Sequence, residues 1–309
     1  MDFFELLFNA NTISATFRMA VSVAFASLGT VFVTRSGVML MGQEGIMLIT
    51  GLAGAAASFF LDNVYLGLLV AIVVGAVFGA VYAFFSVSNR GNDVIIGLGM
   101  NFFGLGLTAV LIKAFWGYQG SSPNVPGIYN FMTAMEAESG GAVTKIFGTQ
   151  NILFVMLFVL AIITWVILYR TPAGLRIRFT GELPVAVEAA GSSAARLRYI
   201  SLIIGGALLA LAGSTVVLGQ VKMFSRDMMN GRGYVGLAMC ALGRYHPVGA
   251  LIGSILYGFT DALQIRLQGE EIPAQFVQMI PYLFTIVVIA LSGNGKAPAA
   301  MGKPLSEKN

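Results

Sequence analysis

Long apolar segments recur along the whole chain, and they constrain its fold more than any other feature. Eight of them are long enough to cross a lipid bilayer, at residues 13–34, 38–60, 64–87, 94–115, 151–169, 199–219, 247–266 and 274–292. A hydrocarbon core of about 30 Å needs about 20 apolar residues in a helix. Backbone groups inside lipid must bond within the protein, and a helix achieves this within one segment. The sequence therefore predicts an all-α polytopic integral membrane protein.

The composition agrees with a membrane protein. Of 309 residues, 57% are hydrophobic and only 10% are charged, whereas soluble proteins carry about 25% charged residues. These values exclude cytosolic enzymes, nucleic-acid-binding proteins and disulfide scaffolds. The net charge of +4 is the expected result of Lys and Arg collecting on the cytoplasmic side. A single cysteine, Cys240, excludes an intramolecular disulfide and a cysteine-based metal cluster.

One apolar stretch, at 234–243, is too short for a full crossing. It follows Gly231 and Gly233 and ends in the sequence Gly-Arg-Tyr-His-Pro of residues 243–247. Transporters use such glycine- and proline-interrupted segments as half-helices. We therefore expect a short broken or re-entrant segment near 234–243, within a total of about 8–10 transmembrane helices.

The distribution of charge predicts the orientation of the chain. The segment 170–198 contains five arginines and two glutamates, and such loops stay in the cytoplasm. The carboxyl terminus then lies inside. The amino terminus lies outside if 234–243 reaches the cytoplasmic side, and a re-entrant segment there would reverse it. The acidic residues expected outside are Asp2, Glu5, Asp62, Glu136, Glu138, Glu270 and Glu271.

These assignments give one transmembrane domain over residues 1–309. Residues 116–150 are rich in Gly, Ser, Pro, Asn and Thr, which is typical of an exposed loop. We expect this loop outside, and the basic loop at 170–198 in the cytoplasm.

Gln43 and Glu44 are polar residues inside an otherwise apolar segment, between Gly42 and Gly45. A carboxylate at this depth costs on the order of 2–3 kcal/mol, so it normally faces a polar cavity or a partner. The two glycines can break the helix here, and broken helices in membranes line protein cavities. We therefore expect a role in a pathway or in the structure. Two alternatives involve no substrate: Glu44 forms a salt bridge with Arg18, or its side chain extends to the membrane interface.

Two later segments add polar or aromatic side chains at membrane depth. Asn101 and Phe102 lie in one of them, and Asp261 and Gln264 lie three residues apart in the other. This spacing puts Asp261 and Gln264 on one helix face, which we expect to look inward. With Gln43 and Glu44, these residues offer hydrogen-bonding groups and an aromatic face without a strong ion site. The six residues form the candidate substrate pathway.

Nothing in the sequence supports catalysis. The sole histidine, His246, has no candidate cysteine partner for a metal site and precedes Pro247, which favours a helix-breaking or interfacial role over metal ligation. The sequence lacks the GxxxxGK[ST] loop that binds ATP phosphates. We expect a non-catalytic protein without metal or cofactor. A stand-alone ion or proton-coupled carrier stays open on composition, although such carriers usually show chains of Asp, Glu and His or two matching halves.

The internal loop contains the sequence TGELPVAVEAAGSSAARLRY at residues 180–199. Residues 184–190 can form about two helical turns that start at Pro184 and stop before Gly191. This pattern predicts a short helix parallel to the membrane. Its small alanines leave a surface on which another protein can dock; a plain basic surface loop is the alternative.

Several motifs in order resemble the permease subunits of bacterial ABC importers of the ribose and branched-chain amino acid type, and among these the nucleoside and simple-sugar permeases. They are RSGVMLMGQEGIMLI at 35–49, NDVIIGLGMNFFGLGLT at 92–108, YRTPAGLRIRFTGELPVAVEAAG at 169–191, NGRGYVGLAMCALGRYHPVGALIGSILYGFTDALQIRLQ at 230–268, IPAQFVQMIPYLFTIVV at 272–288 and APAAMGKP at 297–304. The resemblance covers nearly the whole chain.

The resemblance implies a multi-pass permease in the bacterial inner membrane, surrounded by lipid, that carries nucleosides or, as the alternative, simple sugars. It implies a dimer, usually with a related but different permease, and an external substrate-binding lipoprotein. A separate ATPase with two nucleotide-binding domains would dock inside and hydrolyse the ATP. The implied coupling residues for that ATPase are Gly181, Glu182, Pro184, Ala186, Ala189, Ala190 and Gly191.

Overall fold

The computed structural model describes residues 9–117, 120–132, 141–268, 274–292 and 295–305. Within them the regular secondary structure is helical, apart from two isolated β-bridges. The first helices are α2 (Ala10–Arg35), α3 (Gln43–Leu61), α4 (Val64–Ala83) with its π-helical extension η1 (Phe84–Ser88), and α5 (Asp93–Trp116). The later ones are α7 (Ala142–Gly148), α8 (Ile152–Arg170), α9 (Pro172–Glu182), α10 (Pro184–Ala189), α11 (Ala194–Ser214) with η2 (Thr215–Val221), α12 (Arg232–Leu242), α13 (Pro247–Leu267) and α14 (Ala274–Ser292). The predicted all-α fold is confirmed.

Seven of the described helices are long and apolar enough to cross a membrane. They are α2, α3, α4 with η1, α5, α8, α11 with η2, and α13. The eighth predicted span, 274–292, is α14, which contains Pro281. The short segment predicted near 234–243 is α12, whose 11 residues are about half the length that a full crossing needs.

The Gly-Arg-Tyr-His-Pro sequence forms the predicted helix break. Gly243 ends α12, and Arg244 and Tyr245 adopt positive φ angles of 54° and 56°. His246 then caps α13, because its Nδ1 accepts the Val248 N–H at 3.2 Å. The histidine therefore has the local structural role that its position favoured.

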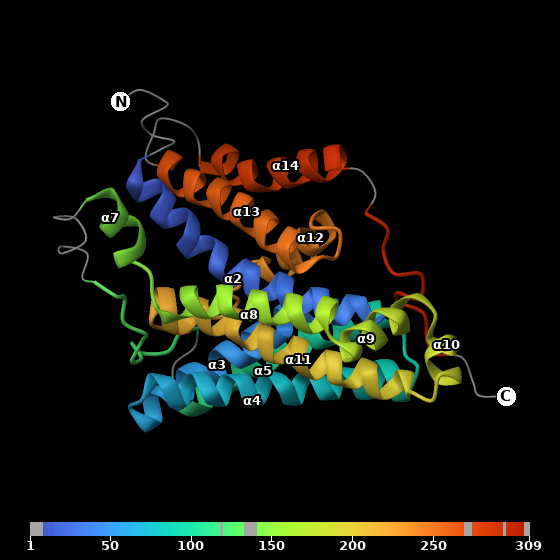
Figure 1. Cartoon of the computed structure of the whole chain (residues 1–309). Helices are drawn as coiled ribbons and strands as arrows, with labels where there is room; N and C mark the ends of the chain where they lie inside the picture. The colour runs from blue at the N-terminus through green and yellow to red at the C-terminus, as the bar shows by residue number, and fades with distance from the viewer. Residues whose placement is uncertain (1–8, 118–119, 133–140, 269–273, 293–294, 306–309) are drawn as a thin grey trace.

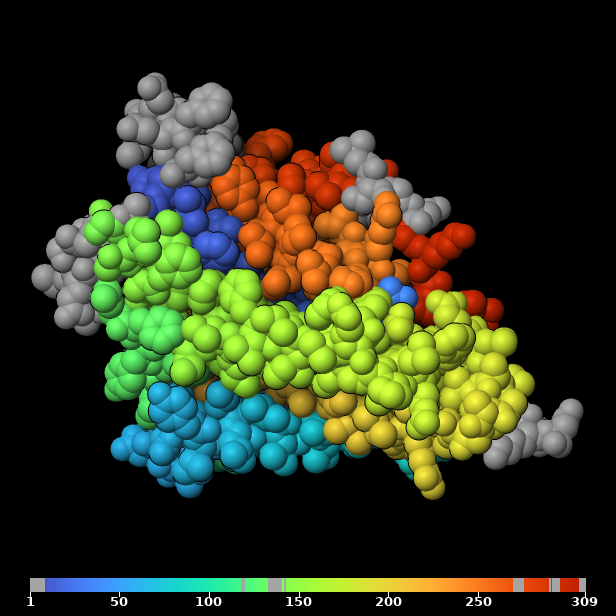
Figure 2. Space-filling model, in the orientation of Figure 1, coloured from blue at the N-terminus to red at the C-terminus, as the bar shows by residue number. Residues whose placement is uncertain are grey.

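α2 lies at the centre of the bundle. Every residue from Ala20 to Thr34 is buried, and the helix contacts α8, α11, α12 and α13. Figure 2 shows α8 and α9 crossing the middle of one face of the molecule. α4, α5 and α8 carry many exposed apolar side chains, as expected of surfaces that meet lipid or another membrane subunit.

Glycines allow some of these helices to approach closely, as their spacing suggested. A Cβ atom on Gly206 would collide with the backbone of α4, and one on Gly205 would lie 3.2 Å from a carbonyl oxygen of α2. α11 is therefore held tightly between α2 and α4. In α5, Gly104 lies against α3 and Gly97 lies against the segment before α3, whereas Gly99 and Gly106 face open space.

The two ends of the bundle hold different segments (Figure 1). The start of α2, α7 and residues 120–132 lie at one end, here named the loop end. α9, α10 and the carboxyl-terminal tail (residues 295–305) lie at the other, the coupling end. Which end faces the cytoplasm stays a prediction from the arginine-rich loop. Six of the acidic residues expected outside are not among the described residues: Asp2, Glu5, Glu136, Glu138, Glu270 and Glu271.

Candidate functional site

The segment between α2 and α3 (residues 37–42) is non-helical and largely buried. Side chains from other helices satisfy its backbone. Asp93 accepts the Met39 N–H at 2.8 Å, Tyr82 donates to the Met39 carbonyl at 2.9 Å, and Asn101 donates to the Met41 carbonyl at 3.0 Å. Such side-chain partners are what non-helical backbone needs at membrane depth. The helix break expected near Gly42 is thus present.

Glu44 caps a different helix. Its two carboxylate oxygens accept the N–H groups of Gly231 and Gly233, each at 2.8 Å, and the residue is 7% exposed. These N–H groups lie at the start of α12, where backbone donors have no partner within the helix and the helix dipole favours negative charge. Glu44 therefore holds α12 against α3. Arg18 is not its hydrogen-bonding partner.

Gln43 and Asn101 support the same junction. Gln43 accepts a hydrogen bond from Thr30 at 3.0 Å and donates to the Leu40 carbonyl at 2.9 Å. The Asn101 amide oxygen accepts the Gly45 N–H at 2.8 Å, and its nitrogen contacts the Tyr234 hydroxyl of α12 at 2.5 Å. The structure thus brings three of the six candidate pathway residues together, where α2, α3, α5 and α12 meet.

The other three candidates lie apart from that junction. Phe102 is 71% exposed on the outer face of α5. Asp261 and Gln264 are partly exposed on α13, and Asp261 lies close enough to Arg232, the first residue of α12, for their charges to interact. The six residues therefore do not line one surface within this chain.

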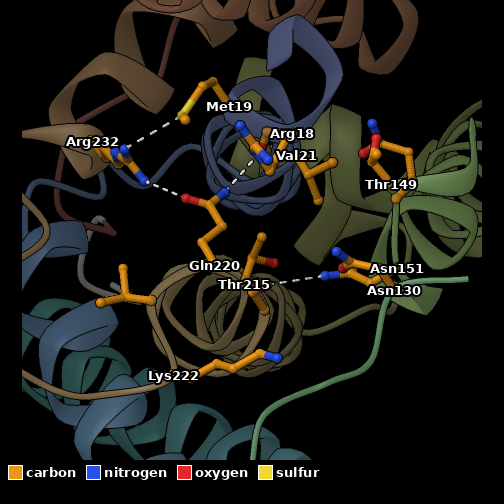
Figure 3. A pocket seen from close by; sticks show the side chains of 13 residues that line it. Arg18, Met19, Val21, Asn130, Thr149, Asn151, Thr215, Gln220, Lys222 and Arg232 are labelled. Atoms are coloured by element: carbon orange, nitrogen blue, oxygen red, sulfur yellow. Dashed lines mark hydrogen bonds between the residues drawn. The ribbon is translucent and has the colours of Figure 1, made fainter. Parts of the chain in front are cut away.

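A polar cavity of about 510 Å³ lies on the other side of the start of α12. Figure 3 shows it between α2, η2 and the loop residues Asn130 and Asn151. Arg232 donates to the Gln220 side chain at 3.2 Å, and Gln220 donates to the Arg18 carbonyl at 2.7 Å. The lining residues are Arg18, Met19, Val21, Asn130, Thr149, Gln150, Asn151, Thr215, Gly219, Gln220, Val221, Lys222 and Arg232.

Sequence reasoning missed this cavity. Its walls come from segments more than 200 residues apart, such as Arg18 and Arg232. Thr215 and Gly219 belong to what reads as an ordinary apolar span at 199–219. The one indication of it in the sequence is Arg18, a charged residue inside the first apolar segment.

The coupling end carries a second candidate site. α10 covers residues 184–189 and is followed by Gly191 with φ of +81°, so the predicted short helix is confirmed. Val187 points inward, whereas Ala186, Ala189 and Ala190 are exposed. A groove of about 340 Å³ beside them is lined by Leu175, Arg176, Phe179, Ala186, Val187, Ala190 and Ser192.

The predicted coupling residues differ in how accessible they are. Glu182 is exposed and Pro184 is partly exposed, but Gly181 is buried. A Cβ atom on Gly181 would meet the backbone of Arg35 and Gly37. Gly181 therefore places the corner between α9 and α10 against the rest of the bundle and offers no surface to another protein.

Comparison with known proteins decides the family. The sequence profile described as "Branched-chain amino acid transport system / permease component" matches residues 12–291. The chain belongs to this family. It is the non-catalytic, multi-pass permease component of an ABC importer, as its motifs suggested. Importers of this kind also comprise an ATPase and a substrate-binding protein, so the permease acts with such partners.

Three relatives resemble the permease over nearly its full length. The guanosine ABC transporter permease protein NupQ of Bacillus subtilis is 30% identical over 98% of each chain. The nucleoside ABC transporter permease protein NupC of Lactococcus lactis is 31% identical over 90% of the permease and 91% of NupC. The putative glucose ABC transporter permease protein TsgC13 of Haloferax volcanii is 28% identical over 92% of each chain.

A solved structure shares the fold. It is described as an inward-facing conformation of a putative metal-chelate type ABC transporter, and it matches with a TM-score of 0.51 and 17% identity. The match covers 93% of the permease and 88% of the other chain. At this identity the likeness concerns the arrangement of helices alone.

Proposed function

We propose that the permease carries nucleosides across the bacterial cytoplasmic membrane. The full-length similarity to two permeases named for guanosine and nucleosides is the observation that carries this proposal. A simple sugar is the second candidate, because the similarity to a putative glucose permease is nearly as great.

The polar cavity supports a small polar cargo. Its volume of about 510 Å³ falls in the range of about 300–1,000 Å³ that is usual for small-molecule sites. Amide and hydroxyl groups from Asn130, Asn151, Thr215 and Gln220 line it. Such groups can exchange hydrogen bonds with the hydroxyls and ring nitrogens of a neutral nucleoside. The cavity is therefore a candidate for the part of the route that begins at the loop end.

The six candidate pathway residues take two roles in this proposal. Gln43, Glu44 and Asn101 hold the start of α12 beside the route, and Asp261 and Gln264 face it from α13. Phe102, on the outer face of α5, offers an aromatic surface where a second permease completes the route. A related but different permease is the proposed partner.

The coupling end is the proposed docking site of an ATPase with two nucleotide-binding domains. Exposed alanines of α10 and the apolar groove beside them leave room for side chains of a partner. Glu182, Pro184, Ala186, Ala189, Ala190 and Gly191 make this surface, with Gly181 behind it. A substrate-binding lipoprotein would dock at the loop end.

The choice of cargo is tested by competition. Cells that express the complete importer should take up labelled guanosine, and unlabelled nucleosides should compete with it. Glucose and ribose at the same concentration should leave uptake unchanged. Importer-dependent uptake of labelled glucose, with no importer-dependent uptake of guanosine, would replace the nucleoside proposal with the sugar proposal.

Orientation is tested with the permease expressed alone and Cys240 replaced by serine. In intact cells, an impermeant maleimide should label Tyr129→Cys at the loop end and should not label Ser193→Cys at the coupling end. Both positions are exposed, so both should react once the cells are permeabilised. Labelling of Ser193→Cys alone in intact cells would invert the orientation.

A further inference from the structure

The carboxyl-terminal tail lies across the coupling end after α14 (Figure 1). The Ala300 N–H donates to the Gly181 carbonyl at 2.8 Å, and the Ala299 N–H donates to the Glu182 carboxylate at 3.2 Å. The Gly302 N–H donates to the Gly37 carbonyl at 3.1 Å. The tail therefore joins the corner between α9 and α10 to the first residue of the non-helical segment before α3.

Arg198 of α11 fixes the tail from inside. It is 2% exposed. Its Nη1 donates to the Lys303 carbonyl at 3.0 Å, and its Nε donates to the Ser36 carbonyl at 3.3 Å. Its Nη2 has no hydrogen-bond partner among the described residues. A buried guanidinium is costly unless its donors are used, and the bonds to the carbonyls of Lys303 and Ser36 offset part of that cost.

The same three elements are in close contact. The Gly181 Cα lies 3.1 Å from where a Cβ of Gly37 would be, and the Arg198 Nη2 lies 3.0 Å from that point. The φ of Gly37 is +92°, which side-chain-bearing residues rarely adopt. Because Gly181 is packed directly against Gly37, the α9–α10 corner cannot shift without pushing Gly37 or breaking the hydrogen bond from Ala300 to Gly181.

Residue 37 begins a connected series of contacts that leads into the membrane. The non-helical segment runs from it to Gln43, where α3 starts. Glu44, the next residue, holds the N–H groups of Gly231 and Gly233 at the start of α12. α12 in turn contributes Arg232 to the wall of the polar cavity. The tail thus connects the docking helices to the element beside the proposed route.

We infer that the carboxyl-terminal tail, pinned by Arg198, transmits movement of α9 and α10 to the non-helical segment and so to α12. Arg198 acts as a positioning residue, since it holds the tail and residue 36 together and touches no substrate. The inference rests on the proposed docking of the ATPase at α10. A tail that merely covers apolar surface would stabilise the permease without affecting how much substrate moves for each ATP hydrolysed.

The test compares transport with ATP hydrolysis in the complete importer, reconstituted in proteoliposomes with labelled guanosine. One variant ends at Lys296, and a second carries Arg198→Met. The control ends at Leu305 and keeps every contact described above. In both variants we expect ATP hydrolysis to continue and guanosine uptake per ATP to fall about 5-fold or more, the low end of coupling between sites.

Arg198→Lys separates positioning from packing. A lysine keeps the positive charge and can donate to the carbonyls of Lys303 and Ser36, whereas methionine fills a similar space without any donor. We therefore expect the lysine variant to recover part of the uptake per ATP that the methionine variant loses. If the truncated chain fails to assemble, this pair of variants decides. Equal, wild-type uptake per ATP in both would overturn the inference.

Failure of the proposed function gives a different result. If the wild-type importer does not carry guanosine, the proposed cargo is wrong, and the same ratio is measured with glucose. If the ATPase assembles normally on a permease with an obstructed α10, the docking proposal is wrong. If only the inference about the tail is wrong, the wild-type importer still carries guanosine and an obstructed α10 still prevents ATPase assembly. The truncated chain and the Arg198 variants then keep the wild-type uptake per ATP.

Discussion

Replacing Glu44 with glutamine is expected to lower the stability of the permease and to abolish most of its transport. The carboxylate accepts the N–H groups of Gly231 and Gly233 at once. Glutamine has one acceptor oxygen, so its NH₂ group would face the other N–H. One unsatisfied buried donor costs about 1–3 kcal/mol. The free energy of unfolding in detergent should fall by about this amount, with a matching fall in melting temperature.

Asp62→Asn is the matched control for the loss of a carboxylate. Asp62 is exposed at the end of α3, with φ of 48°, a conformation that asparagine tolerates. This variant should keep the wild-type melting temperature and guanosine uptake. A Glu44→Gln permease that equals the control in both measurements would show that the carboxylate is not needed to hold α12.

Replacing Ala189 with arginine is expected to prevent the ATPase from docking. Ala189 is exposed on α10, and a long charged side chain there would fill the space that a docked partner needs. Affinity for the ATPase should fall about 30-fold or more, equivalent to the loss of about 2 kcal/mol that marks an interface hot spot. Co-purification with the ATPase and ATP-driven uptake should both disappear, while the amount of inserted permease stays unchanged.

Ala189→Ser serves as the control, because it changes polarity with little added volume. It should assemble with the ATPase and transport as the wild type does. Normal assembly and transport by the arginine variant would move the coupling site away from α10.

Local chemistry explains which features could be predicted. Apolar segments of about 20 residues locate the spans regardless of how they pack. Gly42 lies directly before α3, and Pro184 and Gly191 bound α10, because glycine and proline act on the local backbone. These features need no knowledge of the tertiary structure.

The partners of the polar residues depended on assembly. Glu44 accepts hydrogen bonds from backbone N–H groups 187 and 189 residues further along the chain. A pattern of side chains in the sequence cannot predict such backbone partners. Phe102 is predicted beside the other pathway residues, but apolar side chains lie on every face of α5, so their periodicity does not indicate which face is buried. The polar cavity forms only once α2, η2 and α12 meet.

ATP-dependent uptake is the most direct test of the proposal that this permease belongs to a nucleoside importer. Proteoliposomes should contain the permease, its partner permease and the ATPase, with the loaded binding protein at the loop end and ATP at the coupling end. We expect labelled guanosine to accumulate above its external concentration, and omitting either ATP or the ATPase should stop this accumulation. Guanosine uptake that continues without the ATPase, or ATP-driven uptake of glucose with none of guanosine, would contradict the proposal.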